Sequence, residues 1–128
     1  MRDGKHVILC IDDDPDICEF LRTVLESGGY VASTAATTEE GLNAYKEISP
    51  DLVIVDLMME EIDAGATFVK ELRLLDNTAP IYMLSSVGDD FTQATDSAAL
   101  GLAGVFQKPV SPDRLLSVLK TALKRAAS

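Results

Sequence analysis

Residues 6–29 read HVILCIDDDPDICEFLRTVLESGG, and this stretch decides the class of fold. Its apolar run, His6–Ile11, is typical of a strand buried on both faces of a parallel sheet. Three aspartates follow, of which Asp14 can cap a helix that begins at Pro15. An apolar stripe at helical spacing then runs to the two glycines that end the stretch. The segment therefore predicts a strand joined to an amphipathic helix by an acidic loop.

The same unit recurs along the chain. The apolar runs that predict strands are His6–Ile11, Tyr30–Thr34, Leu52–Val55, Ile81–Leu84 and Ala103–Phe106. Helical patterns follow each of them, so the chain is expected to be an α/β protein with helices on both faces of a parallel sheet. Tyr30–Thr34 alternates between polar and apolar residues, which favours an edge strand.

The later helices carry different signals. Thr37 and Glu40 have the spacing of a capping box, and Pro50 ends the helix that follows. A third helix is predicted from Phe68, Val69, Leu72 and Leu75, and a last one, beginning at Ser111 and Pro112, from Leu115, Leu116, Leu119 and Leu123. The segment Asp89–Leu100 is alanine-rich and weakly amphipathic, and is expected to form the fourth helix.

Length and composition limit the classes of function that are open to this chain. Its 128 residues predict one domain. The net charge of −10 disfavours nucleic-acid binding by a basic face and attraction to anionic membranes. No apolar run reaches the length of about 18 residues that a membrane span needs. The two cysteines are too few for a disulfide framework and are expected to be reduced core residues. We expect a soluble, cytoplasmic chain without membrane insertion.

Reactive side chains stand at the ends of the predicted strands. Asp12 and Asp13 follow the first, Asp56 the third, Ser85 the fourth and Lys108 the fifth. The carboxyl ends of parallel strands meet at one sheet edge, where such folds bind ligands. Crowded carboxylates need a cation or raised pKa values, and Mg²⁺ prefers oxygen ligands. A carboxylate, a magnesium site, a lysine and a hydroxyl together indicate phosphoryl transfer with the carboxylate as nucleophile.

Four segments in this order form a specific signature: ILCIDDDPDI, VIVDLMM around Asp56, PIYMLSS and VFQKP. With them the chain resembles the receiver domains of bacterial two-component response regulators over about residues 6–126. The resemblance implies a flavodoxin-like (βα)5 three-layer sandwich with strand order 2-1-3-4-5. It also implies a signalling switch that accepts a phosphoryl group and catalyses at most its own phosphorylation and dephosphorylation.

The resemblance assigns roles by position. Asp56 matches the phosphoacceptor, Ser85 the switch hydroxyl and Lys108 the partner of the phosphoryl group, with Pro109 after it. The implied cofactor is Mg²⁺, with Mn²⁺ as a substitute, and its ligands would be Asp12, Asp13, Asp56 and the backbone carbonyl of Met58. The donor would be a sensor histidine kinase, a phosphotransfer protein or a small phosphodonor. A downstream protein would bind the face of helix 4, strand 5 and helix 5, without direct nucleic-acid contact.

Some positions depart from the family pattern. Glu60 replaces a common proline, and Val105 stands where a switch aromatic is usual, while Phe106 should face the other side of the sheet. We therefore expect a muted aromatic relay, with signalling through the loop Ser86–Phe91. The resemblance also implies that the residues two positions after Asp56 and after Ser85 influence the water that hydrolyses the acyl phosphate. Here they are Met58 and Val87, which are apolar and cannot orient that water, so we expect slow self-dephosphorylation.

Three other readings compete with this one. An aspartate-nucleophile phosphatase needs a second acid two residues after the nucleophile, where this chain has Met58. A flavodoxin needs a phosphate loop rich in hydroxyls and glycines, whereas Asp12–Asp14 would repel phosphate. A phosphorylation-independent interaction module on the same fold stays open. We expect residues 1–128 to be a single receiver domain without an output domain, either standing alone or as the N-terminal part of a longer protein.

Overall fold

The computed structural model of the chain describes residues 4–56, 64–75, 79–85, 103–108 and 110–127. The expected helix at Asp89–Leu100 lies outside these residues. The described elements are β1 (Val7–Ile11), α1 (Pro15–Ser27), β2 (Val31–Ala35), α2 (Thr38–Ile48), β3 (Leu52–Asp56), α3 (Ala64–Leu74), β4 (Ile81–Ser85), β5 (Gly104–Gln107) and α5 (Pro112–Ala127). Among the helices of this part of the chain, none has both the length and the apolar character to cross a membrane.

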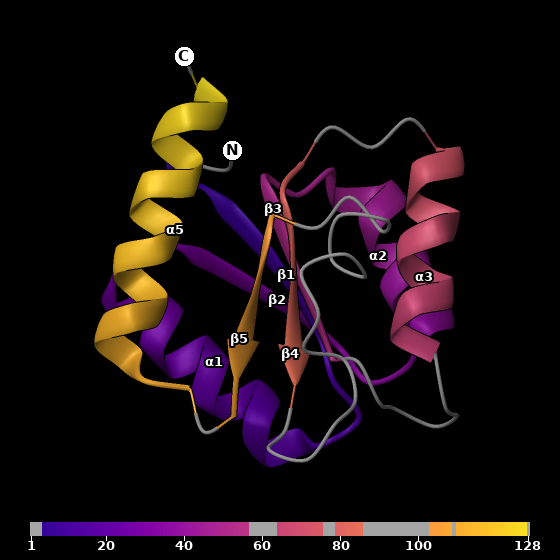
Figure 1. Cartoon of the computed structure of the whole chain (residues 1–128), viewed down its shortest axis with the longest axis horizontal. Coiled ribbons are helices and arrows are strands. Elements are labelled where there is room, and N and C mark those ends of the chain that lie inside the picture. The colour runs from indigo at the N-terminus through magenta and orange to yellow at the C-terminus, as the bar shows by residue number, and fades with distance from the viewer. Residues whose placement is uncertain (1–3, 57–63, 76–78, 86–102, 109, 128) are drawn as a thin grey trace.

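The five strands form one parallel sheet in the order β2-β1-β3-β4-β5. Strand β1 lies between β2 and β3 and pairs with both, so that Ile8 lies opposite Ala32 on one side and Leu52 on the other. Helices α1 and α5 cover one face of the sheet, and α2 and α3 cover the other (Figure 1). The predicted flavodoxin-like three-layer fold and its strand order are confirmed, including the edge position of β2.

Strand alternation divides the core into two clusters, one on each face of the sheet. Ile8 and Cys10 point toward α1 and α5, whereas Leu9 and Ile11 point toward α2 and α3. On β5, Phe106 packs in the first cluster against Tyr82, with the ring centroids 5.2 Å apart, and Val105 packs against the second. The expectation that Phe106 and Val105 face opposite sides is therefore confirmed.

Side-chain caps fix where the first two helices begin. The Asp14 carboxylate accepts from the backbone N–H of Asp16 at 2.9 Å, and the Thr37 hydroxyl accepts from that of Glu40 at 3.0 Å. The Glu40 carboxylate accepts from the N–H of Ala36 at 3.1 Å, one residue before the cap. The predicted capping box therefore forms with its return bond shifted by one residue, and it still satisfies a backbone donor at the helix start.

Two sequence-based assignments were wrong. The apolar spacing placed Leu75 in the third helix, but α3 ends at Leu74, and Leu75 lies after it with 42% of its surface exposed. Cys18 is only half-buried, unlike the fully buried Cys10. Its position on α1 faces the start of the acidic loop instead of the core, and its thiol donates to the backbone carbonyl of Asp12 at 3.2 Å.

The end of α2 contains a strained backbone position. Ser49 follows the helix with φ 47° and ψ 68°, in the left-handed region that costs a non-glycine residue about 1–2 kcal/mol. We expect Ser49→Gly to raise the free energy of unfolding by about 0.5–1 kcal/mol, because glycine removes this strain but loses more entropy on folding. Urea denaturation of both proteins measures this change in the free energy of unfolding. Ser49→Ala, which keeps the strain, should give no such gain, and a gain from both variants would contradict the explanation.

Candidate functional site

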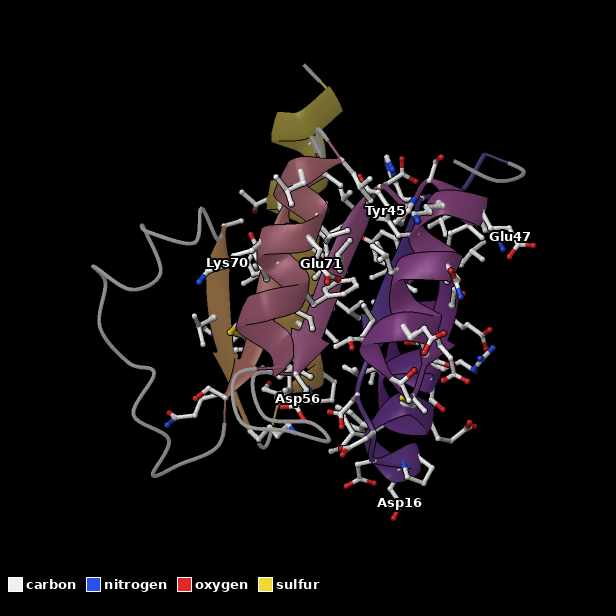
Figure 2. The ribbon with its side chains drawn as sticks, turned by 90° about the vertical axis from the view of Figure 1, so that its right-hand side faces the viewer. Asp16, Tyr45, Glu47, Asp56, Lys70 and Glu71 are labelled. Atoms are coloured by element: carbon white, nitrogen blue, oxygen red, sulfur yellow. The ribbon has the colours of Figure 1, made fainter. Side chains whose placement is uncertain are left out.

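The predicted site residues meet at the carboxyl ends of the strands. Asp56 is the last residue of β3 and Ser85 the last of β4, while Asp12 follows β1 and Lys108 follows β5. In Figure 2 the Asp56 side chain lies at the same end of the molecule as Asp16 at the start of α1, and Tyr45 lies toward the opposite end. Because all strands are parallel, residues distant in sequence share this edge.

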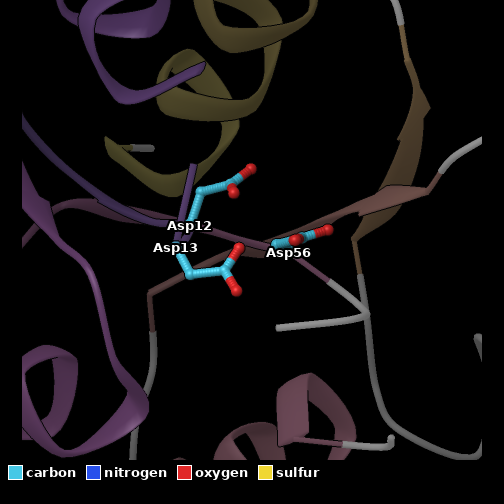
Figure 3. Close-up of side chains that lie close together, drawn as sticks. All are labelled: Asp12, Asp13 and Asp56. Carbon is cyan, nitrogen blue, oxygen red and sulfur yellow. The ribbon is translucent and has the colours of Figure 1, made fainter. Parts of the chain in front are cut away.

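Three carboxylates gather at this edge. Asp12, Asp13 and Asp56 each offer an oxygen, and these oxygens all lie within 4.8 Å of one another (Figure 3). Asp12 is 1% exposed and Asp56 is 5% exposed, whereas Asp13 is exposed to solvent. Carboxylates this close repel one another, and burial increases the cost of keeping them charged. The site therefore requires a positive charge.

Hydrogen bonds hold Asp12 in the acidic cluster, despite the repulsion between its carboxylates. Its Oδ1 atom accepts from the backbone N–H of Asp14 at 2.9 Å, and its own N–H donates to the carbonyl of Ala35 at 3.1 Å. The acidic loop thus turns back on itself between β1 and α1. The carboxylate is fixed by the same local bonds that start the helix, so little further ordering is needed when a ligand binds.

Lys108 supplies the positive charge. Its Nζ atom lies 3.2 Å from Oδ2 of Asp12 and 3.3 Å from Oδ1 of Asp56. Partial burial alone would lower the pKa of Lys108, but the charges of Asp12 and Asp56 outweigh it and raise the pKa above its ordinary value. The ammonium is therefore charged at neutral pH and bridges two of the three carboxylates.

The backbone holds Lys108 beside Ser85. The N–H of Lys108 donates to the carbonyl of Ser85 at 2.7 Å, which continues the pairing of β4 with β5 past Gln107. Ser85 is 3% exposed and lies one residue beyond Leu84, which pairs with Asp56. The hydroxyl-bearing residue and the lysine are thus positioned together next to the acidic cluster, as their places at the strand ends predicted.

The donors present fit a divalent cation. All three acidic side chains offer carboxylate oxygen, which hard cations such as Mg²⁺ prefer over nitrogen or sulfur. Oδ2 of Asp12 is fully buried and accepts no well-aligned hydrogen bond within the described part of the chain, so only the Lys108 ammonium balances it. Met58, the predicted carbonyl ligand, lies outside the described residues, as do Glu60, Val87, Pro109 and the loop Ser86–Phe91.

Sequence reasoning missed a cavity of about 640 Å³ that opens beside the acidic cluster. It lies between the start of α1, the end of β2 and the start of α2, and is lined by Asp12, Asp13, Pro15, Cys18, Glu19, Arg22, Thr34, Ala35, Ala36 and Glu40. Four of these residues, Pro15, Cys18, Glu19 and Arg22, have the i, i+3, i+4, i+7 spacing of one helix face. That spacing could have indicated a second functional face of α1.

Most polar groups in the cavity wall already have partners. Nη2 of Arg22 donates to the hydroxyl of Thr34 at 3.2 Å, and the Cys18 thiol donates to the carbonyl of Asp12. Burial, and next the charge of Asp12, raise the pKa of the Cys18 thiol, so this cysteine stays protonated near neutral pH. The cavity therefore gives access to the acidic cluster without adding a reactive nucleophile.

Comparison with known proteins gives the family. Residues 8–120 match the response regulator receiver domain family. The chemotaxis protein CheY of Bacillus subtilis is 33% identical over 119 residues, which cover 92% of this chain and 98% of that protein. The chain therefore belongs to the response regulator receiver domain family and is a receiver domain of the two-component type, a class of signalling switch.

Longer relatives and solved structures support the same family assignment. "Probable transcriptional regulator ycf27" of Guillardia theta is 36% identical over 121 residues, 94% of this chain and 46% of that protein. The chain thus spans about half the length of the ycf27 regulators that it matches. A response regulator receiver domain protein from Clostridium thermocellum superposes with a TM-score of 0.84 at 28% identity, covering 94% of this chain and 95% of that one.

Proposed function

We propose that this receiver accepts a phosphoryl group on Asp56 in a reaction that requires Mg²⁺ or Mn²⁺ held by Asp12, Asp13 and Asp56. One observation carries the proposal: the three carboxylates lie within 4.8 Å of one another, and the Lys108 ammonium lies 3.3 Å from Asp56. This arrangement combines a nucleophile, a set of cation ligands and a second positive charge at one sheet edge. Family membership supports the same reading.

The proposed reaction is a displacement at phosphorus. An oxygen of the Asp56 carboxylate attacks the phosphorus and forms a P–O bond, while the bond from phosphorus to the donor breaks and its electron pair leaves with the donor. With a phosphohistidine donor, the bond that breaks is the P–N bond, and the leaving group is the imidazole of that histidine. A bound divalent cation would neutralise charge on the phosphoryl oxygens.

Each residue of the site has a role in this proposal. Lys108 pairs with the phosphoryl oxygens once they are attached to Asp56, and the hydroxyl of Ser85 donates to one of them. Asp12 and Asp13 keep the cation next to the acceptor. Because Lys108 already bridges Asp12 and Asp56, charge added at Asp56 changes a contact that reaches β5 through the lysine.

Partners and domain organisation follow from the same proposal. The phosphoryl donor is a sensor histidine kinase, a phosphotransfer protein or a small phosphodonor, and this chain accepts the phosphoryl group in the cytoplasm. Residues 1–128 act as one receiver domain, and phosphorylation switches its contacts with a downstream protein. The phosphorylated form should be long-lived because Met58 and Val87 offer no group that assists a hydrolytic water.

The test is intact-mass analysis of the purified chain after incubation with a small phosphodonor. With Mg²⁺ present we expect a mass gain of one phosphoryl group, and with excess chelator we expect none. Borohydride reduction of the acyl phosphate followed by peptide mass spectrometry should locate the modification at Asp56. Equal labelling in chelator, or modification at another residue, would contradict the proposal. No labelling under any condition would favour a phosphorylation-independent module.

A further inference from the structure

Charge is distributed unevenly over this molecule. Helix α5 contains four of the eleven basic residues of the chain and only one of its twenty-one acidic residues. The helix therefore has a net charge of +3, and the remainder of the chain has a net charge of −13. An acidic protein with one basic helix has a strongly oriented field, which can steer a charged partner toward that helix.

Three basic side chains of α5, those of Arg114, Lys120 and Lys124, are exposed to solvent. Its leucines Leu115, Leu119 and Leu123 are buried in the cluster between the helix and the sheet. The side of α5 away from the sheet, seen at the outer edge of Figure 1, is exposed. We call this surface the α5 outer face and define it by the exposed residues Arg114, Ser117, Lys120, Thr121 and Lys124.

The stability of α5 itself accounts for only some of its basic residues. Lys120 and Lys124 lie in the second half of the helix, where positive charge interacts favourably with the helix dipole. Arg114 is the third residue of the helix, where the dipole disfavours a cation. Within the described part of the chain, neither Arg114 nor Lys120 forms an ion pair with a carboxylate. No carboxylate of the described residues therefore neutralises these two charges.

We propose that the α5 outer face docks an acidic segment of a partner protein. Carboxylates of the partner would pair with Arg114 and Lys120, with the positive charge of Lys124 nearby, and the Ser117 hydroxyl between them offers a donor. The Thr121 hydroxyl already donates to the backbone carbonyl of Ser117 at 3.3 Å. The charge of −13 on the rest of the chain repels an acidic partner everywhere else, so this face fixes its orientation. The same charge opposes a long phosphate backbone, which favours protein over nucleic acid. That this acidic partner is the downstream signalling protein rests on the proposed function.

The test uses NMR titration of the ¹⁵N-labelled chain with a synthetic glutamate-rich peptide. We expect amide shifts concentrated in α5, and salt should weaken the binding. A variant combining Arg114→Gln, Lys120→Gln and Lys124→Gln should lose about tenfold in affinity, because each exposed charge pair contributes modestly. The matched control combines Lys5→Gln, Lys46→Gln and Lys70→Gln, which removes the same charge from exposed positions elsewhere.

The outcomes separate specific docking from a net-charge effect. The matched control should bind the peptide within about twofold of the wild type. Equal weakening in both variants, or shifts concentrated outside α5, would overturn the proposal. Tighter binding of a short DNA duplex than of the peptide would overturn it in favour of nucleic acid. If the chain binds the peptide at α5 but accepts no phosphoryl group, the docking surface stands and the proposed phosphorylation fails.

Discussion

Asp56→Asn is expected to abolish phosphoryl acceptance, with no mass gain after incubation with a small phosphodonor and Mg²⁺. The amide oxygen is a weak nucleophile, and the substitution also removes one of the three carboxylates available to the cation. The fold should remain intact, because Asn has the same shape and Lys108 keeps its contact with Asp12 at 3.2 Å. Intact mass measures the first effect and circular dichroism the second.

Asp14→Asn is the matched control for this variant. Asp14 belongs to the same acidic loop but is exposed, and its role is to cap α1 by accepting from the N–H of Asp16. Asparagine caps helices as well as aspartate does, so this variant should be phosphorylated at the wild-type rate. Labelling of Asp56→Asn to the wild-type extent would show that another residue is the acceptor.

Lys108→Met should destabilise the metal-free protein by about 2–3 kcal/mol and slow phosphorylation about a hundredfold. Methionine keeps the apolar stem but leaves Asp12 and Asp56, both almost fully buried, without their shared cation. This cost is smaller than the roughly 3–5 kcal/mol of a fully buried broken ion pair, because Lys108 is partly exposed and solvent screens its charge. Urea denaturation in chelator measures the stability, and Mg²⁺ should restore much of the loss.

The pH dependence of Lys108→Met has a defined sign. The fold raises the pKa of Lys108, so its stabilising effect is fully present below the ordinary lysine pKa of about 10.4 and is lost as the pH rises through the raised value. The stability difference between wild type and variant should therefore be constant near neutral pH and shrink in strongly alkaline solution. A difference that grows with pH would contradict the assigned contacts.

Lys70→Met is the control for the loss of a lysine as such. Lys70 is exposed on α3, and its replacement should change the free energy of unfolding by less than about 0.5 kcal/mol. Its phosphorylation rate should match the wild type. A similar loss of stability in both variants would show that the effect of Lys108→Met reflects net charge and not the bridge to Asp12 and Asp56.

The strands were predictable because each is a short apolar run, and burial on both faces of a parallel sheet requires such runs. Observed and predicted strands differ by about one residue at their ends, as with Asp56, which belongs to β3. The faces of Phe106 and Val105 followed from alternation alone. The muted aromatic relay stays a prediction, since the loop Ser86–Phe91 lies outside the described residues.

Helix ends and partly buried positions were less predictable. Leu75 continues the apolar spacing of α3, but spacing cannot tell whether the backbone is still helical there. Cys18 falls near the start of the helical pattern of α1, which does not show that its thiol contacts the carbonyl of Asp12 beside a cavity. That cavity depends on how α1, β2 and α2 pack together, which no local pattern contains.

The sequence by itself determined the α/β class and the placing of Asp12, Asp13, Asp56, Ser85 and Lys108 at one sheet edge, because local periodicity and parallel strand direction are sufficient for both. Only the tertiary structure decided which charges meet. It placed the Lys108 ammonium between Asp12 and Asp56, left Asp13 exposed, and turned the basic side of α5 to solvent. The physical reason is that electrostatic interactions depend on distance and burial in space, and separation along the chain specifies neither.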